Sequence, residues 1–141
     1  MLHLNEKYAK EMLAHAREDN PNEWCGILGG QDGEVLKLYR IVNTEASPFR
    51  YRMDSSEHYR AIKDMDDNGW ETIAVYHSHT HSPAYPSDTD VRLATWNGTS
   101  IWPDVYYVLV SLLDEEDLRI RAFHIEDGKV TEEDVIIGNP K

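Results

Sequence analysis

The run TIAVYHSH, residues 72–79, constrains the fold more than any other stretch, because it is apolar and β-branched until it ends in two histidines. A second run, VYYVLVSLL at 105–113, has the same apolar character and is longer. Runs of this kind are typical of strands buried on both faces, in sheets that helices cover on either side. Both runs are therefore predicted to be central strands of one sheet.

Helical and hairpin patterns surround these two strands. Apolar residues recur at helical spacing over 5–20, DSSE at 54–57 offers a capping box for a second helix that ends near 68–69, and a third helical pattern covers 88–96. Hairpins are predicted from 23–30 with 34–43 and from 118–125 with 130–137, and a strand from the alternation at 47–53. These elements predict an α/β fold with a mixed sheet flanked by two or three helices.

Composition limits both the domain count and the kinds of partner. A chain of 141 residues is large enough for one core but too small for two, so one domain is expected over residues 1–141. The net charge of −12 argues against nucleic acid and anionic membranes, because both need clustered Lys and Arg; a basic protein partner stays open. The single cysteine, Cys25, excludes an intrachain disulfide and a cysteine-rich zinc knuckle.

Targeting signals are missing from the sequence. No stretch approaches the 18 or so apolar residues of a membrane span, and the N-terminus has neither a basic nor an apolar signal region. The expectation is a soluble, cytoplasmic protein that does not bind membranes.

The segment HSHTHSPAYPSDTD, residues 77–90, has the spacing of a metal site. Side chains two apart on a strand share a face, so His77 and His79 project together, about 7 Å apart along the backbone. Asp90 falls in the first turn of the next predicted helix, where it can supply a third, oxygen ligand. Two nitrogens and one carboxylate suit Zn²⁺ with water in the fourth position, the arrangement of catalytic zinc.

A purely structural interpretation competes with this one. Ser87 and Asp90 have the spacing of a capping box at a helix start, and two histidines at the end of a strand are ordinary polar residues. The spacing alone does not decide between a metal site and a cap.

Beside IAVY, the segment HSHTHSPAYPSDTD resembles the signature of the JAMM (MPN-plus) zinc metallopeptidases, H-x-H-x7-S-x2-D, which has a glutamate upstream in a context like E-x-C-G. The matching context here is NEWCGILGG, which makes Glu23 that glutamate. The similarity covers nearly the whole chain. It implies the JAMM/MPN (cytidine-deaminase-like) fold for residues 1–141.

The resemblance also implies a role for each matched residue. His77, His79 and Asp90 would hold one zinc ion, Glu23 would act as general base and acid, and Ser87 would donate a hydrogen bond to the oxyanion. Glu23 has a rival interpretation, as a surface residue that merely begins a strand.

Other reactive or aromatic residues have less specific interpretations. His81 departs from the signature and is expected in the loop or facing substrate rather than as a ligand, since three protein ligands and water complete the site. Cys25 invites a thiol-nucleophile interpretation, although a cysteine in an apolar strand usually packs in the core. Trp96, Trp102, Tyr106 and Tyr107 are compatible with a peptide-binding surface, but core packing is more typical of such clusters.

Among these peptidases, the chain looks most like the compact prokaryotic enzymes that release cysteine from a sulfur-carrier protein, through the runs YHSHT, AYPSDTD, SPFRYRMDSSE, YYVLVS and DGKVTEEDV. This implies a partner that is a small ubiquitin-like sulfur carrier with a Gly-Gly C-terminus, and a role in cysteine biosynthesis. The nearest rival is an isopeptidase that removes a ubiquitin-like modifier from lysine. A non-catalytic MPN scaffold is the second alternative, and the oligomeric state, homodimer included, stays open.

Overall fold

The computed structural model describes residues 2–18, 22–47, 51–80, 82–93, 95–96, 99–100, 104–113, 120–126 and 128–138. Its helices are α1 (Glu6–Glu18), α2 (Ser55–Asp67) and α3 (Asp88–Leu93). Its strands are β1 (Leu2–Leu4), β2 (Cys25–Gln31), β3 (Glu34–Ile41), β4 (Glu71–His79), β5 (Thr95–Trp96), β6 (Thr99–Ser100), β7 (Tyr106–Ser111), β8 (Ile120–Glu126), β9 (Lys129–Glu133) and β10 (Val135–Ile137).

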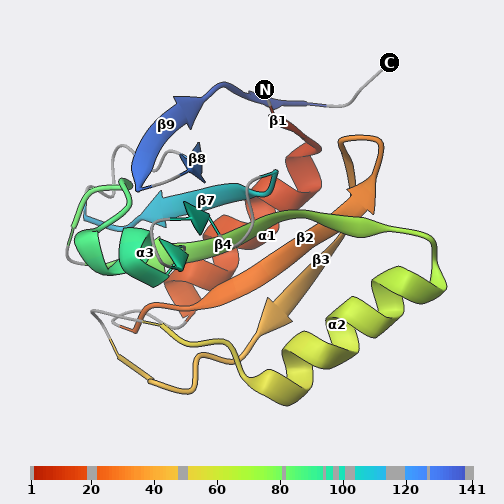
Figure 1. The fold of residues 1–141 in the computed structure, drawn as a ribbon, viewed down its shortest axis with the longest axis horizontal. Coiled ribbons are helices and arrows are strands. Elements are labelled where there is room, and N and C mark those ends of the chain that lie inside the picture. Colours follow the sequence, from red (N-terminus) through yellow and green to blue (C-terminus); the bar gives the residue numbers. More distant parts are fainter. Residues whose placement is uncertain are drawn as a thin grey trace.

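Eight of the described strands form one mixed sheet (Figure 1). Its order is β10-β1-β3-β2-β4-β7-β8-β9, and β5 and β6 form a separate pair. The β4–β7, β1–β3 and β1–β10 pairs are parallel, while β2–β3, β2–β4, β7–β8 and β8–β9 are antiparallel. The predicted central strands, β4 and β7, lie side by side in the middle of the sheet.

The two faces of the sheet bury separate apolar clusters. Successive residues of β4 alternate between them: Ala74 and Tyr76 pack with α1, whereas Val75 packs with Ala61 and Met65 of α2. The alternation follows from the pleat, which sends neighbouring side chains to opposite faces. The expected mixed sheet with helices against it is therefore confirmed, and α1 and α2 cover different faces.

Both predicted hairpins and both long helices are present. The β2–β3 turn contains Asp32 and Gly33, each with positive φ (54° and 78°), as a two-residue hairpin turn requires. At the start of α2, Asp54 accepts a hydrogen bond from the Glu57 amide at 3.0 Å, as the capping pattern predicts. Only half of the box forms, because the Glu57 carboxylate accepts from the Val42 amide instead (2.8 Å).

The prediction of one closing strand over 130–137 is wrong in one respect. It divides at Asp134: β9 pairs with β8, whereas β10 pairs with β1 at the opposite edge of the sheet. The carbonyl of Asp134 accepts a hydrogen bond from the Leu2 amide at 2.8 Å, so the chain passes from one sheet edge to the other there. The short β1 has no local sequence pattern of its own and lies between β10 and β3.

Two further boundaries differ from the prediction. The helix expected over 88–96 ends at Leu93, and Thr95–Trp96 pairs with Thr99–Ser100 as a short antiparallel ribbon. The strand expected over 47–53 is reduced, within its described part, to one bridge between Met53 and Asn43. In its place, the Asn43 side chain accepts the hydrogen bond of the Arg52 amide (2.9 Å).

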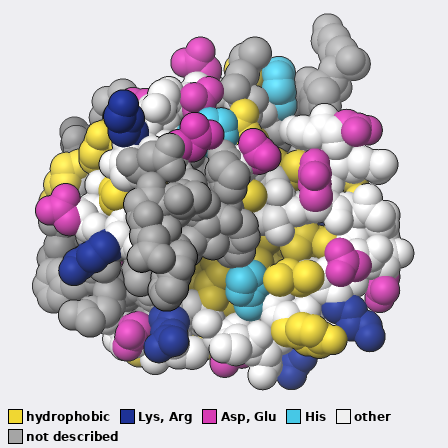
Figure 2. Space-filling view, in the orientation of Figure 1, with side chains coloured by type: hydrophobic (Ala, Val, Ile, Leu, Met, Phe, Trp, Pro, Cys, Tyr) yellow, Lys and Arg dark blue, Asp and Glu magenta, His cyan; other side chains and the backbone are white. Residues whose placement is uncertain are grey.

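The charged side chains do not gather on one element of the face in view. Figure 2 shows acidic side chains spread across it, as the net charge of −12 leads one to expect. No described helix is long and apolar enough to cross a membrane.

Candidate metal centre

His77 and His79 lie at the end of β4, with both side chains almost fully buried (2% exposed each). Each occupies a ladder position, since His77 pairs with Cys25 of β2 and Leu109 of β7, and His79 with Ser111 of β7. Their Nε2 atoms lie 3.1 Å apart. The strand thus brings the two imidazoles together on one face, as the sequence predicts.

Asp90, from the first turn of α3, completes a triangle with them. Its Oδ2 lies 3.2 Å from Nε2 of His77 and 3.1 Å from Nε2 of His79. Burial alone would raise its pKa, but the neighbouring His77 and the hydrogen bonds it accepts lower the pKa well below the usual range. The carboxylate is therefore ionised and faces both imidazoles.

The capping interpretation of Ser87 and Asp90 is also correct. The Ser87 amide donates to Oδ2 of Asp90 at 2.9 Å, and the Asp90 amide donates to the Ser87 hydroxyl at 3.1 Å. The two interpretations therefore describe the same residues, because the cap fixes the carboxylate that faces the histidines. The Ser87 hydroxyl acts as the acceptor in this cap, so its own hydrogen stays available to another acceptor.

The hydrogen bonding of His79 shows what this triangle needs. Its Nδ1 lies 2.8 Å from the carbonyl oxygen of Pro83, which can only accept, so Nδ1 carries the hydrogen. In the neutral ring, Nε2 then presents a lone pair to the Asp90 carboxylate and to Nε2 of His77. Electron-rich atoms at this distance require a proton or a cation between them.

The triangle has the dimensions of a tetrahedral metal site. With Zn–N and Zn–O bonds of about 2.0–2.2 Å, tetrahedral ligand atoms lie roughly 3.3–3.6 Å apart. The three distances of 3.1–3.2 Å are close to this. Two imidazoles and one carboxylate also form the donor set of catalytic zinc sites. The residues present thus fit a divalent cation, which His77, His79 and Asp90 would hold.

Glu23 joins the cluster from the segment before β2. Ligand atoms of Glu23, His77 and His79 all lie within 4.8 Å of one another, and the Glu23 side chain is buried (4% exposed). Burial raises its pKa to about 7, with His79 opposing the shift and Asp90 adding to it. The rival interpretation of Glu23, as a surface residue at a strand start, is wrong.

This pKa can be measured directly. We expect the Glu23 carboxyl of the metal-free protein to titrate near pH 7, because burial disfavours its charged form. Zinc should lower that pKa, since a nearby cation stabilises the carboxylate. Carboxyl ¹³C NMR titrations with and without zinc check both statements. A midpoint near 4.5 without metal would show that Glu23 is exposed to water.

Sequence reasoning missed two neighbours of the histidines. The Tyr51 ring stacks on His77, with centroids 4.4 Å apart and planes inclined by 26°. The Pro83 carbonyl fixes the tautomer of His79. A tyrosine in a loop carries no sequence signal for such a stack, and a backbone carbonyl carries none at all. Within the described part of the chain, Nδ1 of His77 is buried without a hydrogen-bond partner.

Cys25, Tyr107 and Tyr106 lie in the core or against another ring. Cys25 is fully buried in the α2-side cluster and points its thiol at the Ile41 carbonyl (3.5 Å); burial raises its pKa to about 12, so the core interpretation is confirmed. Tyr107 is also in this core, and Tyr106 stacks on His124. His81, Trp102 and the Trp96 side chain lie outside the described residues.

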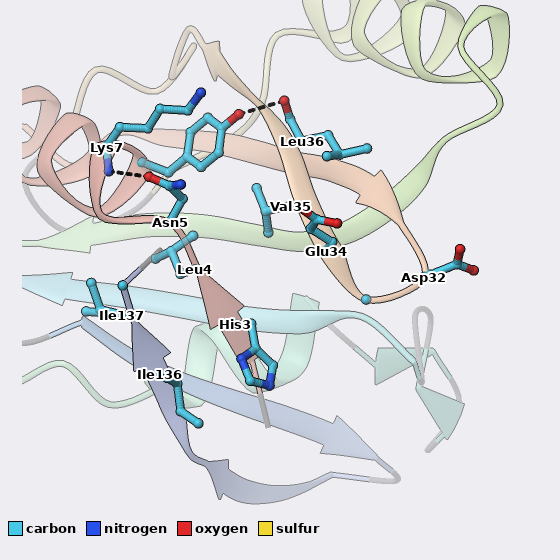
Figure 3. Close-up of a pocket in the computed structure, with 13 residues that line it drawn as sticks. His3, Leu4, Asn5, Lys7, Asp32, Glu34, Val35, Leu36, Ile136 and Ile137 are labelled. Atoms are coloured by element: carbon cyan, nitrogen blue, oxygen red, sulfur yellow. Dashed lines mark hydrogen bonds between the residues drawn. The ribbon is translucent and has the colours of Figure 1, made fainter. Parts of the chain in front are cut away.

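A hollow of about 590 Å³ lies away from His77 and His79 (Figure 3). Residues of β1, β10 and the beginning of β3 line it, among them His3, Leu36 and Ile136. Tyr8 of α1 borders it and donates from its hydroxyl to the Leu36 carbonyl (2.6 Å). His77 lies level with the other end of β3, about 20 Å along the strand, because Cys25 of the intervening β2 pairs with both His77 and Ile41. His77, His79 and Asp90 are therefore not among the residues that line this hollow.

Comparison with known proteins assigns the chain to a family. The sequence model of the prokaryotic homologs of the JAB domain matches residues 5–125. The chain belongs to this prokaryotic JAB family. The match includes the His77, His79 and Asp90 cluster and Glu23, and it confirms the resemblance to JAMM/MPN proteins. Solved JAMM and JAB1/MPN structures share the fold, which confirms the expected fold class.

Two relatives of this JAB chain are named as peptidases. The CysO-cysteine peptidase of Mycobacterium tuberculosis is 45% identical over 126 residues, which cover 88% of this chain and 82% of that protein. A Thermus thermophilus protein named "Probable TtuB-protein conjugate cleaving protease" is 31% identical over 97 residues, 68% of this chain and 65% of that protein. Together with the family match, these relatives identify the chain as a hydrolase of the JAMM class.

A solved structure extends the similarity to the whole chain. The solution structure of a Desulfitobacterium hafniense protein is 39% identical and superposes with a TM-score of 0.85, covering 99% of this chain and 94% of that one. The fold around the JAB cluster is therefore shared with an experimentally determined protein.

Proposed function

We propose that the chain is a zinc-dependent peptidase that hydrolyses the amide bond after the Gly-Gly end of a ubiquitin-like sulfur carrier and releases cysteine. One observation carries the proposal: three electron-rich atoms of His77, His79 and Asp90 lie 3.1–3.2 Å apart beside the buried Glu23. The 45% identity to a CysO-cysteine peptidase supports the choice of substrate. Release of cysteine from the carrier would place the enzyme in cysteine biosynthesis.

The residues that match the family signature each have a part in the proposed reaction. Zinc, when bound, would polarise the scissile carbonyl and lower the pKa of a water molecule in its open coordination position. Glu23 accepts a proton from the attacking water as the new C–O bond forms. It then passes that proton to the leaving amine as the C–N bond breaks. Its buried carboxyl has an oxygen within 4.8 Å of ligand atoms of both histidines, which suits an exchange of protons with a water molecule held beside them.

Ser87 and the neighbours of the histidines complete this mechanism. The Ser87 hydroxyl accepts from the Asp90 amide and keeps its own hydrogen for the oxyanion that develops on the carbonyl. Pro83 holds His79 in the tautomer that presents Nε2, and Tyr51 packs against His77. A flexible Gly-Gly tail can reach such a buried centre, because it has no side chains to exclude.

A thiol mechanism finds no support at Cys25. Its sulfur is buried against the Ile41 carbonyl, and a pKa raised to about 12 leaves almost no thiolate at neutral pH. A cysteine hydrolase, the enzyme that a thiol nucleophile at Cys25 would imply, would survive chelators and lose activity with iodoacetamide.

The leaving amine distinguishes the proposal from its nearest rival. We expect the zinc-loaded protein to cleave a carrier–cysteine adduct, and intact-mass spectrometry should show the loss of one cysteine. The matched substrate is the same carrier joined through its C-terminal glycine to the Nε of lysine. Cleavage of the lysine adduct alone would replace the proposal with isopeptidase activity, which the relationship to the Thermus protease would favour.

A further inference from the structure

The backbone of Glu23 is held by a loop rather than by the sheet. β2 begins two residues later, at Cys25, so no strand ladder fixes the peptide groups of Glu23. Its N–H donates to the Ser47 carbonyl at 2.8 Å. Its carbonyl accepts from Nδ2 of Asn43 at 2.7 Å. Both partners belong to the segment that follows β3.

Asn43 is the centre of a small hydrogen-bond network in this loop. Its Oδ1 accepts from the amides of Glu45 (3.0 Å) and Arg52 (2.9 Å), while its Nδ2 donates to Glu23. These partners define the orientation of the amide group, because two N–H groups need the oxygen and a carbonyl needs the nitrogen. Only a side chain that both donates and accepts can make all three bonds.

The same network reaches the other half of the site. The Arg52 amide that Asn43 binds follows directly on Tyr51, whose ring stacks on His77 at a centroid distance of 4.4 Å. One side chain thus joins the segment that bears Glu23 to the segment that packs against a histidine of the metal cluster. We therefore expect an effect of Asn43 on the reaction to pass through the segments that these hydrogen bonds join.

We propose that Asn43 is a positioning residue that sets the distance between the Glu23 carboxylate and the reacting water. This inference rests on the proposed peptidase function. Proton transfer needs the carboxylate within about 2.6–3.2 Å of the water, and a misplacement of about 1 Å can cost roughly 100-fold in rate. Without the bond from Asn43 Nδ2 to its carbonyl, the main chain of Glu23 keeps the bond from its N–H to Ser47.

Asn43→Asp is the sharpest test, because it removes the donor and keeps the two acceptor contacts. It also places an oxygen 2.7 Å from the Glu23 carbonyl, where it repels. Asn68→Asp is the matched control: Asn68 Nδ2 donates to the Asp64 carbonyl at 2.8 Å, at the C-terminal end of α2. Asn43→Ala and Asn68→Ala repeat the comparison without the added charge.

With carrier–cysteine as substrate, we expect both Asn43 variants to lose kcat by roughly 100-fold while KM stays within about twofold. Zinc content should match the wild type, and the Tm should fall no further than in the Asn68 variants. The Glu23 amide resonance of the metal-free protein should move in the Asn43 variants and stay in place in the Asn68 variants.

The inference is overturned if the Asn43 and Asn68 variants have the same kcat, or if neither Asn43 variant folds, since Asn43 would then serve stability alone. If wild-type protein cleaves neither adduct, the proposed function fails, and the NMR comparison still tests the placement of Glu23. An unmoved Glu23 amide in the Asn43 variants would refute the positioning role, whatever the substrate.

Discussion

Replacing Glu23 by glutamine should lower kcat by roughly 10²–10⁴-fold and leave zinc bound. Glutamine has the shape of the glutamate but cannot accept a proton, so the substitution removes the proton acceptor and no proposed metal ligand. The fold should tolerate it well. Glu23 is 4% exposed and burial raises its pKa to about 7, so a neutral amide avoids the cost of a buried charge above that pH.

The measurement is kcat for carrier–cysteine cleavage, with zinc content determined on the same sample by elemental mass spectrometry. Glu34→Gln, an exposed position at the start of β3, is the control and should keep wild-type activity. Near-normal turnover by Glu23→Gln would remove Glu23 from the mechanism. Loss of zinc together with activity would instead make Glu23 a ligand.

Asp90→Asn should weaken zinc binding by at least about 100-fold, because loss of even an outer partner of a zinc ligand costs 10–100-fold. The substitution separates the two functions of Asp90. Asparagine can still accept the Ser87 amide hydrogen bond that begins α3, so the helix cap survives. Asparagine lacks the negative charge of the Asp90 carboxylate. In the wild type, Oδ2 of that carboxylate lies 3.1–3.2 Å from Nε2 of both imidazoles.

Zinc titration followed by calorimetry measures this change, and thermal unfolding of the metal-free proteins measures the cap. Asp54→Asn makes the same exchange at the cap of α2 and should leave zinc affinity unchanged. Asp54→Asn should change the free energy of unfolding by no more than about 1 kcal/mol. Asp90→Asn should destabilise the metal-free protein further at neutral pH, because the lowered pKa of Asp90 means that its ionised form stabilises the fold. Unaltered zinc affinity in Asp90→Asn would mean that Asp90 serves only as a cap.

Elements defined by local pattern were predictable from sequence. The apolar runs that became β4 and β7, the Asp32–Gly33 turn and the Asp54 cap each depend on neighbouring residues alone. Elements that depend on distant partners were not. β1 and β10 exist because they pair with each other across the full length of the chain, and no local pattern near Leu2 or Asp134 announces that pairing.

The same division applies to the site. Spacing placed His77 and His79 on one face, and the family resemblance added Glu23, which the fold brings to them. The contacts of Asn43 and Tyr51 were not foreseen, because alternation suggested a strand over 47–53. A side chain took the place of a strand partner there, since the Asn43 amide group satisfies the Arg52 N–H.

The central claim is that His77, His79 and Asp90 hold one zinc ion beside a carboxylate that does not bind it. Diffraction at the zinc absorption edge, from crystals of the zinc-loaded wild-type protein, tests this most directly. We predict a single anomalous peak about 2.0–2.2 Å from Nε2 of both histidines and Oδ2 of Asp90, with Glu23 outside bonding distance. A peak elsewhere, or none among these three residues, would contradict the claim.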